Sequence, residues 1–180
     1  MTRSLTIAIA LALSAPVLAQ THAEAMARLA PFQGTYALDG VAQIDEGTYA
    51  GTLTIAPTLG GHFQEWTWEM TSDGMAPTHL RFITTYNVAS RAYTIWRFDS
   101  RDISSEQTGA LGNDPQGSLQ FDGDVLVMAW PTVNPDDPTM RGLFRNTVRI
   151  VSSGLNVVTD VQPEGGRPLV AIATTRASRR

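Results

Sequence analysis

Cysteine and lysine are both absent from this chain of 180 residues, and charged residues of either sign are few. Without cysteine the chain has no disulfide framework, no thiol nucleophile, no cysteine-ligated zinc site and no iron–sulfur cluster. All 13 basic residues are therefore arginine, and the 17 acidic residues bring the formal net charge to −4. This mild acidity, with a charged fraction of 17%, argues against a nucleic-acid-binding protein, which would carry a basic patch or stripe.

Apolar residues make up 43% of the chain. That share argues against disorder, because it supplies enough apolar surface to build a core. A chain of this length buries most of the surface that its unfolded form exposes. No internal repeat, low-complexity tract or linker interrupts it, so we expect one domain.

The first 19 residues have the three regions of a secretory signal peptide. Arg3 gives the positive start, residues 5–15 form an apolar run, and the small Ala19 precedes the expected cleavage point. The apolar run is shorter than the roughly 18 residues that span a bilayer. We therefore expect a periplasmic or secreted protein, cleaved after Ala19, with no transmembrane segment left in the mature chain.

A short helix and lead-in are expected in residues 20–33, ahead of the main domain. Thr21 and Glu24 have the spacing of a capping box, in which each side chain bonds the other residue's backbone N–H. Alanine-rich residues 23–30 continue the helix, and Pro31 ends it. Its apolar residues fall at helical spacing, so the helix should lie on an apolar surface.

Beyond this helix the pattern changes to short strand-like runs separated by Gly, Asn and Asp. Asp-Gly pairs at residues 39–40, 73–74 and 122–123 favour tight hairpins, because such pairs adopt positive φ angles. Residues 130–139 contain three prolines and are expected to form a loop. Strands at such short, regular intervals are typical of an antiparallel sandwich or barrel. The expected strands cover residues 34–42, 48–56, 62–71, 78–86, 92–99, 104–110, 116–121, 124–130, 143–151, 155–162 and 168–175.

Alternation of apolar and polar side chains indicates which face of each strand is buried. A register slip of one residue would exchange the two faces, so the choice is strongly specified. The face expected to point inward carries Trp66, Trp68, Met70, Leu80, Phe82, Thr84, Tyr86, Thr94, Trp96, Phe98, Phe144, Val148 and Ile150.

Six aromatic residues on this inner face are the candidate ligand-binding residues. A barrel of roughly eight strands is either filled by its side chains or holds one small ligand, so a packed core is the alternative. The candidates are Trp66, Trp68, Phe82, Tyr86, Trp96 and Phe98.

The opposite face carries charges of both signs, at Glu65, Glu69, Arg81, Arg97, Arg145 and Arg149. On an outer face these residues would form cross-strand ion pairs, each of which adds little stability. Alternatively, Glu65 or Glu69 would act as a base while Arg81 or Arg97 binds an anion, which would make the barrel an enzyme. We expect the ion pairs and assign no catalytic residue.

No metal site and no cofactor are expected. The histidines are His22, His62 and His79, and no two have the i, i+4 spacing of a helical metal site. His22 should lie exposed near the mature N-terminus, and His62 should begin a strand at one rim. The chain also lacks the Gly-x-Ser-x-Gly motif of a serine nucleophile.

Several short segments carry a family resemblance. They are Leu29-Ala-Pro-Phe-Gln-Gly-Thr-Tyr36, Gly51-Thr52, Leu59-Gly-Gly-His-Phe63, Thr85-Tyr-Asn87, Tyr93-Thr-Ile-Trp96 and Asp99-Ser100, with Gly109 beyond them. Through these segments the chain resembles a bacterial calycin-like (lipocalin-like) β-barrel family, domain of unknown function 1579, often found in exported proteins. The resemblance implies an all-β fold, a single antiparallel calycin-like β-barrel over residues 34–176, and it supplies no catalytic residue.

Two positions depart from the family pattern. Tyr36 stands where Trp is usual, and Asn87 stands where Asp is usual. In lipocalins the opening Trp packs with a late Arg near the closed end of the barrel, and Tyr36 with Arg176 would take that place here. A related barrel family binds haem through a late His, and the absence of His after His79 counts against that role.

Three functional hypotheses follow. The first is an exported, non-enzymatic barrel that holds a small apolar or amphipathic ligand. The second is the barrel enzyme described above, acting on a polar substrate. The third is a structural or protein-binding envelope module that uses the proline-rich residues 130–139 as its contact surface.

Overall fold

The computed structural model describes residues 20–43, 47–72, 76–100, 117–134, 137–163, 165 and 168–180. The expected signal peptide at residues 1–19 and the expected strand at residues 104–110 lie outside the described residues. No helix in the described ranges is long and apolar enough to cross a membrane.

One short α-helix, α1 (His22–Ala27), and a 3-10 turn, η1 (Ala30–Phe32), precede the strands. A second 3-10 turn, η2 (Leu59–Gly61), joins two of them. The ten described strands are β1 (Gly34–Ala42), β2 (Thr48–Thr58), β3 (Phe63–Ser72), β4 (Thr78–Asn87), β5 (Ala92–Asp99), β6 (Gly117–Asp122), β7 (Val125–Asn134), β8 (Asp137–Val151), β9 (Gly154–Pro163) and β10 (Val170–Arg179).

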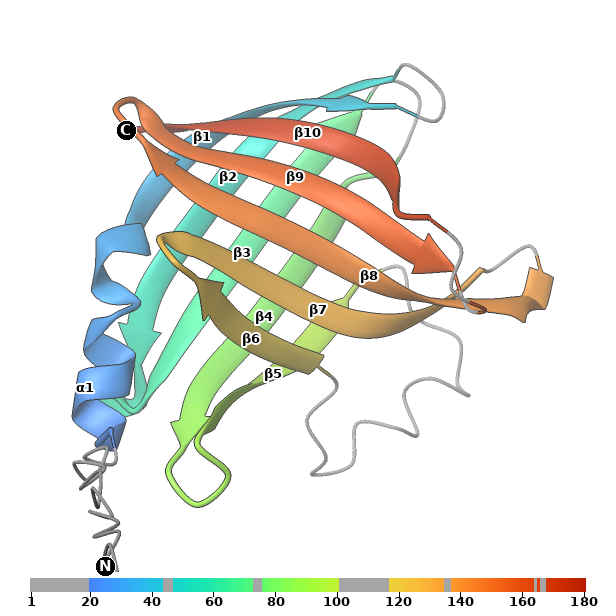
Figure 1. Cartoon of the computed structure of the whole chain (residues 1–180). Helices are drawn as coiled ribbons and strands as arrows, with labels where there is room; N and C mark the ends of the chain where they lie inside the picture. Colours follow the sequence, from blue (N-terminus) through green and yellow to red (C-terminus); the bar gives the residue numbers. More distant parts are fainter. Residues whose placement is uncertain are drawn as a thin grey trace, which may run out of the picture.

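These strands form one closed antiparallel barrel in which each strand pairs with its neighbours in sequence (Figure 1). The first and last strands, β1 and β10, pair over seven residues and close the ring. Beyond them, the backbone N–H of Arg180 donates to the carbonyl of Thr35 at 2.9 Å. The expected all-β antiparallel barrel with a short N-terminal helix is confirmed.

Residues of α1 and η1 close one end of the barrel. Leu29 and Phe32 are buried there, and the Tyr93 hydroxyl donates to the carbonyl of Ala25 at 2.5 Å. The expected capping box of α1 is present, because Thr21 and Glu24 bond each other's backbone N–H groups. We call this the helix end of the barrel.

The connections between strands are fully described at the helix end of the barrel but only in part at the opposite end. At the helix end, β2–β3, β4–β5, β6–β7 and β8–β9 are joined by short described segments. At the opposite end, which we call the far end, every connection includes undescribed residues.

Residues 130–139 do not form the expected loop. β7 continues to Asn134 and β8 begins at Asp137, so Trp130 pairs with Phe144 and Pro131 with Leu143. Proline is tolerated at this position because the β6 ladder extends along β7 only to Ala129, and proline is accepted at strand edges. The described residues of the contact loop in the third hypothesis therefore belong to β7 and β8, which are part of the barrel wall.

The Asp39-Gly40 pair, expected to favour a hairpin, lies inside β1. Gly40 is needed there for space: a Cβ would lie 2.2 Å from Cζ of Tyr49 on the neighbouring strand. The Tyr49 ring thus crosses over Gly40, and its hydroxyl bonds to Oγ1 of Thr175 on β10. The Asp122-Gly123 pair does form the expected turn, with a φ of 59° at Gly123.

Candidate ligand-binding site in the barrel lumen

Inward-facing side chains at the helix end form a fully packed core. Apolar residues from opposite walls of the barrel meet there and are at most 2% exposed. They include Leu53, Ile55, Trp66, Ile95, Leu126, Met128, Val148, Leu155 and Val157.

The expected faces of β5 are wrong. Tyr93 and Ile95 are buried inside the barrel, whereas Trp96 is half-buried and Phe98 is exposed on the outer face. The strand is apolar on both faces, so alternation alone does not orient it. Two of the six candidate ligand-binding residues, Trp96 and Phe98, consequently lie outside the lumen.

Packing against the ends of the strand accounts for this orientation. Tyr93 reaches the carbonyl of Ala25 in α1, which ties β5 to the helix end. On the outer face, the Trp96 ring lies 6.4 Å from the ring of Phe63 on β3. The outer tryptophan is therefore covered in part by a side chain of β3, which lies on the other side of β4.

The other four candidates, Trp66, Trp68, Phe82 and Tyr86, are buried on inward faces as expected. Tyr86 contacts Tyr93 at the helix end, with ring centroids 5.0 Å apart. The ring of Phe82 instead contacts that of Trp130, which was not among the six candidate residues.

Phe82, Arg97, Trp130 and Phe144 form a group that we call the Trp130 cluster. The Trp130 ring lies 5.0 Å from that of Phe82 and stacks on Phe144 at 5.3 Å, with 21° between planes. The guanidinium carbon of Arg97 lies 5.9 Å from the centroid of Trp130. Trp130 was missed because residues 130–139 read as a loop, and Arg97 because the faces of β5 were exchanged.

Burial decreases from the helix end towards the far end. Met70, Leu80 and Phe144 face inward and pack against the core, but each is only partly buried. Phe82 and Trp130 in the Trp130 cluster are buried, so Phe144 is its one partly buried ring.

Several polar atoms of inward-facing side chains are buried with no hydrogen-bond partner among the described residues. They are Nε1 of Trp66, Nε1 of Trp68, Nε2 of Gln64 and Oγ1 of Thr84. The three nitrogens are donors, and the hydroxyl can also donate. A buried donor without a partner costs free energy, so each of these atoms favours a polar group arriving beside it.

The charged candidates of the enzyme hypothesis lie on both faces of the barrel wall. Arg81 on the outer face bonds Glu65, with Nη2 2.9 Å from Oε2. Glu69 is also exposed on that face, whereas Arg97 faces inward. Both candidate bases of the enzyme hypothesis thus share the outer side with Arg81, and Arg97 lies on the inner side.

Of the remaining candidates, Arg145 and Arg149 also face outward. Nη2 of Arg145 bonds Oδ2 of Asp160 at 3.0 Å, which confirms an outer cross-strand ion pair. Arg149 is exposed near the helix end.

Two histidines lie closer together than the sequence suggests. The rings of His22 and His62 are 5.4 Å apart, and Nε2 of His22 lies 3.1 Å from Oγ1 of Thr85. His22 is therefore half-buried against β4, where exposure was expected. No group of three or more His, Asp or Glu residues that could hold a metal occurs in the described part of the chain.

The late arginine that packs on Tyr36 is Arg179, and the expected Arg176 is wrong. The guanidinium carbon of Arg179 lies 5.6 Å from the ring centroid of Tyr36, and its Nη2 donates to the Tyr36 hydroxyl at 3.1 Å. Arg179 faces inward because it pairs with Tyr36 across the β1–β10 ladder. Arg176, three residues earlier, is exposed on the outer wall.

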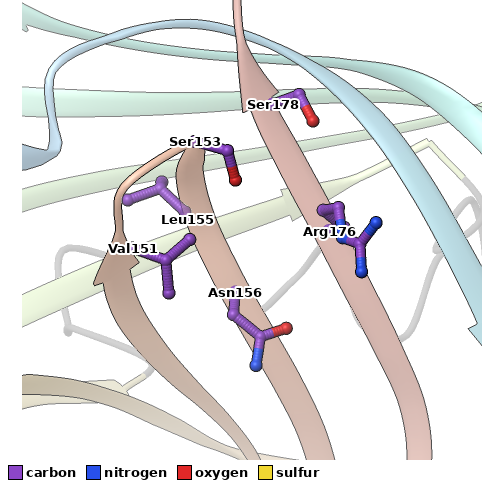
Figure 2. A pocket seen from close by; sticks show the side chains of 6 residues that line it. All are labelled: Val151, Ser153, Leu155, Asn156, Arg176 and Ser178. Carbon is purple, nitrogen blue, oxygen red and sulfur yellow. The ribbon is translucent and has the colours of Figure 1, made fainter.

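The surface of the described residues includes two hollows of small-molecule size. One, of about 430 Å³, opens on the outer wall near the C-terminus and is shown in Figure 2. It is polar, and its lining residues are Val151, Ser153, Leu155, Asn156, Arg176 and Ser178. The other, of about 540 Å³, lies at the helix end. Neither hollow is lined by residues of the Trp130 cluster.

No family model matches the chain, so the resemblance to domain of unknown function 1579 rests on the quoted segments alone. No curated protein matches it either. A similar solved structure is a designed protein, described as the de novo design of a fluorescence-activating beta barrel. It is 13% identical, with a TM-score of 0.41, over 85% of this chain and 98% of that chain. At that TM-score the likeness carries no argument about function.

Proposed function

We propose that this protein is an exported, lipocalin-like barrel that holds a small amphipathic ligand in its lumen, beside the Trp130 cluster. The finer family assignment to domain of unknown function 1579 belongs to the same proposal. It is supported by the short sequence segments that resemble that family and by the antiparallel barrel.

The unpartnered donors of the lumen carry this proposal. Trp66 and Trp68 are at most 4% exposed, and the Nε1 atom of each has no partner among the described residues. In a core built only for packing, a buried polar group without a partner is destabilising. A ligand that accepts hydrogen bonds would give both Nε1 atoms a partner.

The rings of the Trp130 cluster indicate the rest of the ligand. Stacked Trp130 and Phe144 present flat apolar surface, and Phe144 is only partly buried. Aromatic walls of this kind favour a planar or ring-containing apolar body. The ligand that fits has an apolar body with acceptor oxygens or nitrogens at one side.

The N-terminal sequence supports the proposal that the protein is exported to the periplasm or out of the cell. The N-terminal residues carry the positive start, apolar run and small residue of a signal peptide. The mature protein should therefore begin at Gln20, and N-terminal sequencing of protein purified from the producing cell tests this. Retention of Met1 would contradict export by this route.

A matched pair of tryptophan variants tests ligand binding. Protein purified from its own compartment is examined by native mass spectrometry for a bound small molecule. Trp68→Phe keeps an aromatic ring in the lumen but removes the Nε1 donor, so ligand affinity should fall by about tenfold. Trp96→Phe makes the same change on the outer wall, and its affinity should equal that of the wild type.

Three results would overturn the proposal. One is that no molecule co-purifies and none binds from an extract of the native compartment. The second is equal loss of ligand in Trp68→Phe and Trp96→Phe. The third is unchanged binding in both Trp68→Phe and Trp130→Leu while the variants remain folded by circular dichroism.

A further inference from the structure

The hollow at the helix end has the features of a second binding site, separate from the lumen. Its volume of about 540 Å³ lies within the range of small-molecule sites. It is bounded by η1, by the β6–β7 turn and by the end of β8, and all its lining residues are described. The lining includes Arg28, Phe32, Phe121, Asp124, Arg149 and Ile150.

Arg28 is held in place at the wall of this hollow. It follows the last turn of α1, and its backbone N–H donates to the carbonyl of Ala25 at 3.2 Å. Its guanidinium carbon lies 4.0 Å from the ring centroid of Phe121 on β6. A guanidinium stacked on an aromatic face keeps its edge N–H groups free to donate to an oxyanion.

Arg149 supplies a second positive charge. It lies on the outer face of β8, is exposed, and pairs across the ladder with the neutral Asn156. Asp124, on the β6–β7 turn, is the acidic residue of the lining. The lining therefore carries two positive charges and one negative charge, and its field favours a monovalent anion.

Apolar side chains lie beside these charges. Phe32 is buried beneath the hollow, Phe121 is partly buried, and Ile150 is 48% exposed although it ends an inward-facing row of β8. Exposed apolar surface next to a cation suits a molecule with an apolar body and one anionic group.

We infer that this hollow binds a small organic anion, of the aromatic carboxylate class, outside the lumen. The carboxylate accepts charge-assisted hydrogen bonds from Arg28 and Arg149, and the ring lies against Phe121 and Ile150. This inference is independent of the proposed lumen ligand, because the two sites share no residue.

Titration of the mature protein with benzoate, followed by ¹H–¹⁵N NMR, tests the inference. Benzoate should shift the backbone amides of Gly123 and Val125 in a saturable way. Benzyl alcohol, which keeps the ring and lacks the charge, should bind at least about tenfold more weakly, because a charge-assisted hydrogen bond is lost.

Arginine variants supply the matched controls. Arg28→Gln and Arg149→Gln should each weaken benzoate binding by about tenfold or more. Arg176→Gln removes an exposed arginine from the other surface hollow and should leave binding unchanged. Arg149 is exposed on a strand, so its variant should keep the dispersed spectrum of the folded protein.

The same titration defines the results that would overturn the inference. Equal affinity for benzoate and benzyl alcohol would mean that the hollow does not select an anion. Shifts confined to inward-facing residues of β3, β4 and β7 would place the benzoate in the lumen instead. Saturable shifts that persist in both arginine variants, or no saturable shift at all, would also exclude the site.

Discussion

At the residue scale, Gly40 shows how one missing side chain shapes the barrel wall. Its place on an inward face of β1 is occupied by the ring of Tyr49 from β2. The Tyr49 hydroxyl passes over β1 and bonds Thr175 on β10. One tyrosine thereby links three adjacent strands next to the β1–β10 closure.

Gly40→Ala should destabilise the protein by about 1–3 kcal/mol, as expected when a methyl group is forced into a packed core. Gly40 has no positive φ, so the cost comes from the clash with Tyr49 and not from the backbone. Urea denaturation measures it. In a Tyr49→Ala background the same substitution should cost much less, and an equal cost in both backgrounds would contradict this explanation.

The ion pair of Glu65 with Arg81 should contribute little. The side chains are 23% and 53% exposed, so solvent screens their attraction. A double-mutant cycle with Glu65→Gln and Arg81→Gln should give a coupling of about 1 kcal/mol or less, reduced further by salt.

The more buried pair of Arg145 with Asp160 is the comparison, with exposures of 33% and 12%. Its coupling should be larger than that of Glu65 with Arg81 and less sensitive to salt. A large, salt-insensitive coupling at Glu65 would show that this carboxylate is less hydrated than its exposure indicates.

At the scale of the element, alternation predicted strands well and oriented them only where one face was plainly polar. β3 alternates Trp with Glu and Thr, and its inward face was predicted correctly. β5 carries aromatic residues on both faces, and its orientation was predicted wrongly. The deciding contact, Tyr93 with the carbonyl of Ala25, joins residues 68 positions apart and leaves no local signal.

The lack of a local signal for tertiary contacts also explains two other wrong predictions, the loop at residues 130–139 and the pairing of Arg176 with Tyr36. The prolines of residues 130–139 predicted a loop, because their local preference does not show that β6 ends beside them. Arg179, and not Arg176, is the partner of Tyr36 because of the β1–β10 register, which the sequence alone does not show. The sequence therefore located the aromatic residues of the lumen in part, and the tertiary contacts selected among them.

The residues of α1 and η1 that close the helix end of the barrel should be essential to stability. Phe32 is 2% exposed, and its ring lies 6.0 Å from Trp66 and 6.3 Å from Phe121. Phe32→Ala should therefore cost about 3–5 kcal/mol, measured by urea denaturation. Phe98→Ala removes the same group from the outer wall, where Phe98 is 39% exposed, and should cost far less. Similar losses in the two variants would mean that the helix end is not packed as described.

At the scale of the whole molecule, closure gives every described strand two neighbours and leaves the lumen as the common interior. The helix end is packed, and Phe82 and Trp130 belong to the same core, whereas Phe144 beside them is only partly buried. The proposed ligand site therefore adjoins the packed core, because Trp66 belongs both to that core and to the unpartnered donors of the lumen.

Stability at alkaline pH should depend in part on Tyr49 and Tyr93. Lysine and cysteine are absent, so tyrosine is the side chain that titrates near pH 10. Burial raises the pKa of Tyr49 above its usual 10.0, although the bond to Thr175 opposes this. Burial also raises the pKa of Tyr93, and the charge of Arg28 opposes it.

A raised pKa means that the folded state favours the neutral phenol. The stabilisation is complete below the pKa of the unfolded chain, near pH 10, and is lost as the pH rises through the folded value. The free energy of unfolding should therefore fall above about pH 10.

Tyr49→Phe and Tyr93→Phe should each be less stable than the wild type at neutral pH, by about 1 kcal/mol for the lost hydrogen bond. Each should nevertheless show a shallower alkaline fall, and the double variant the shallowest. Urea denaturation across this pH range measures the slopes, and a double variant with the wild-type slope would show that neither phenol is buried in the folded protein.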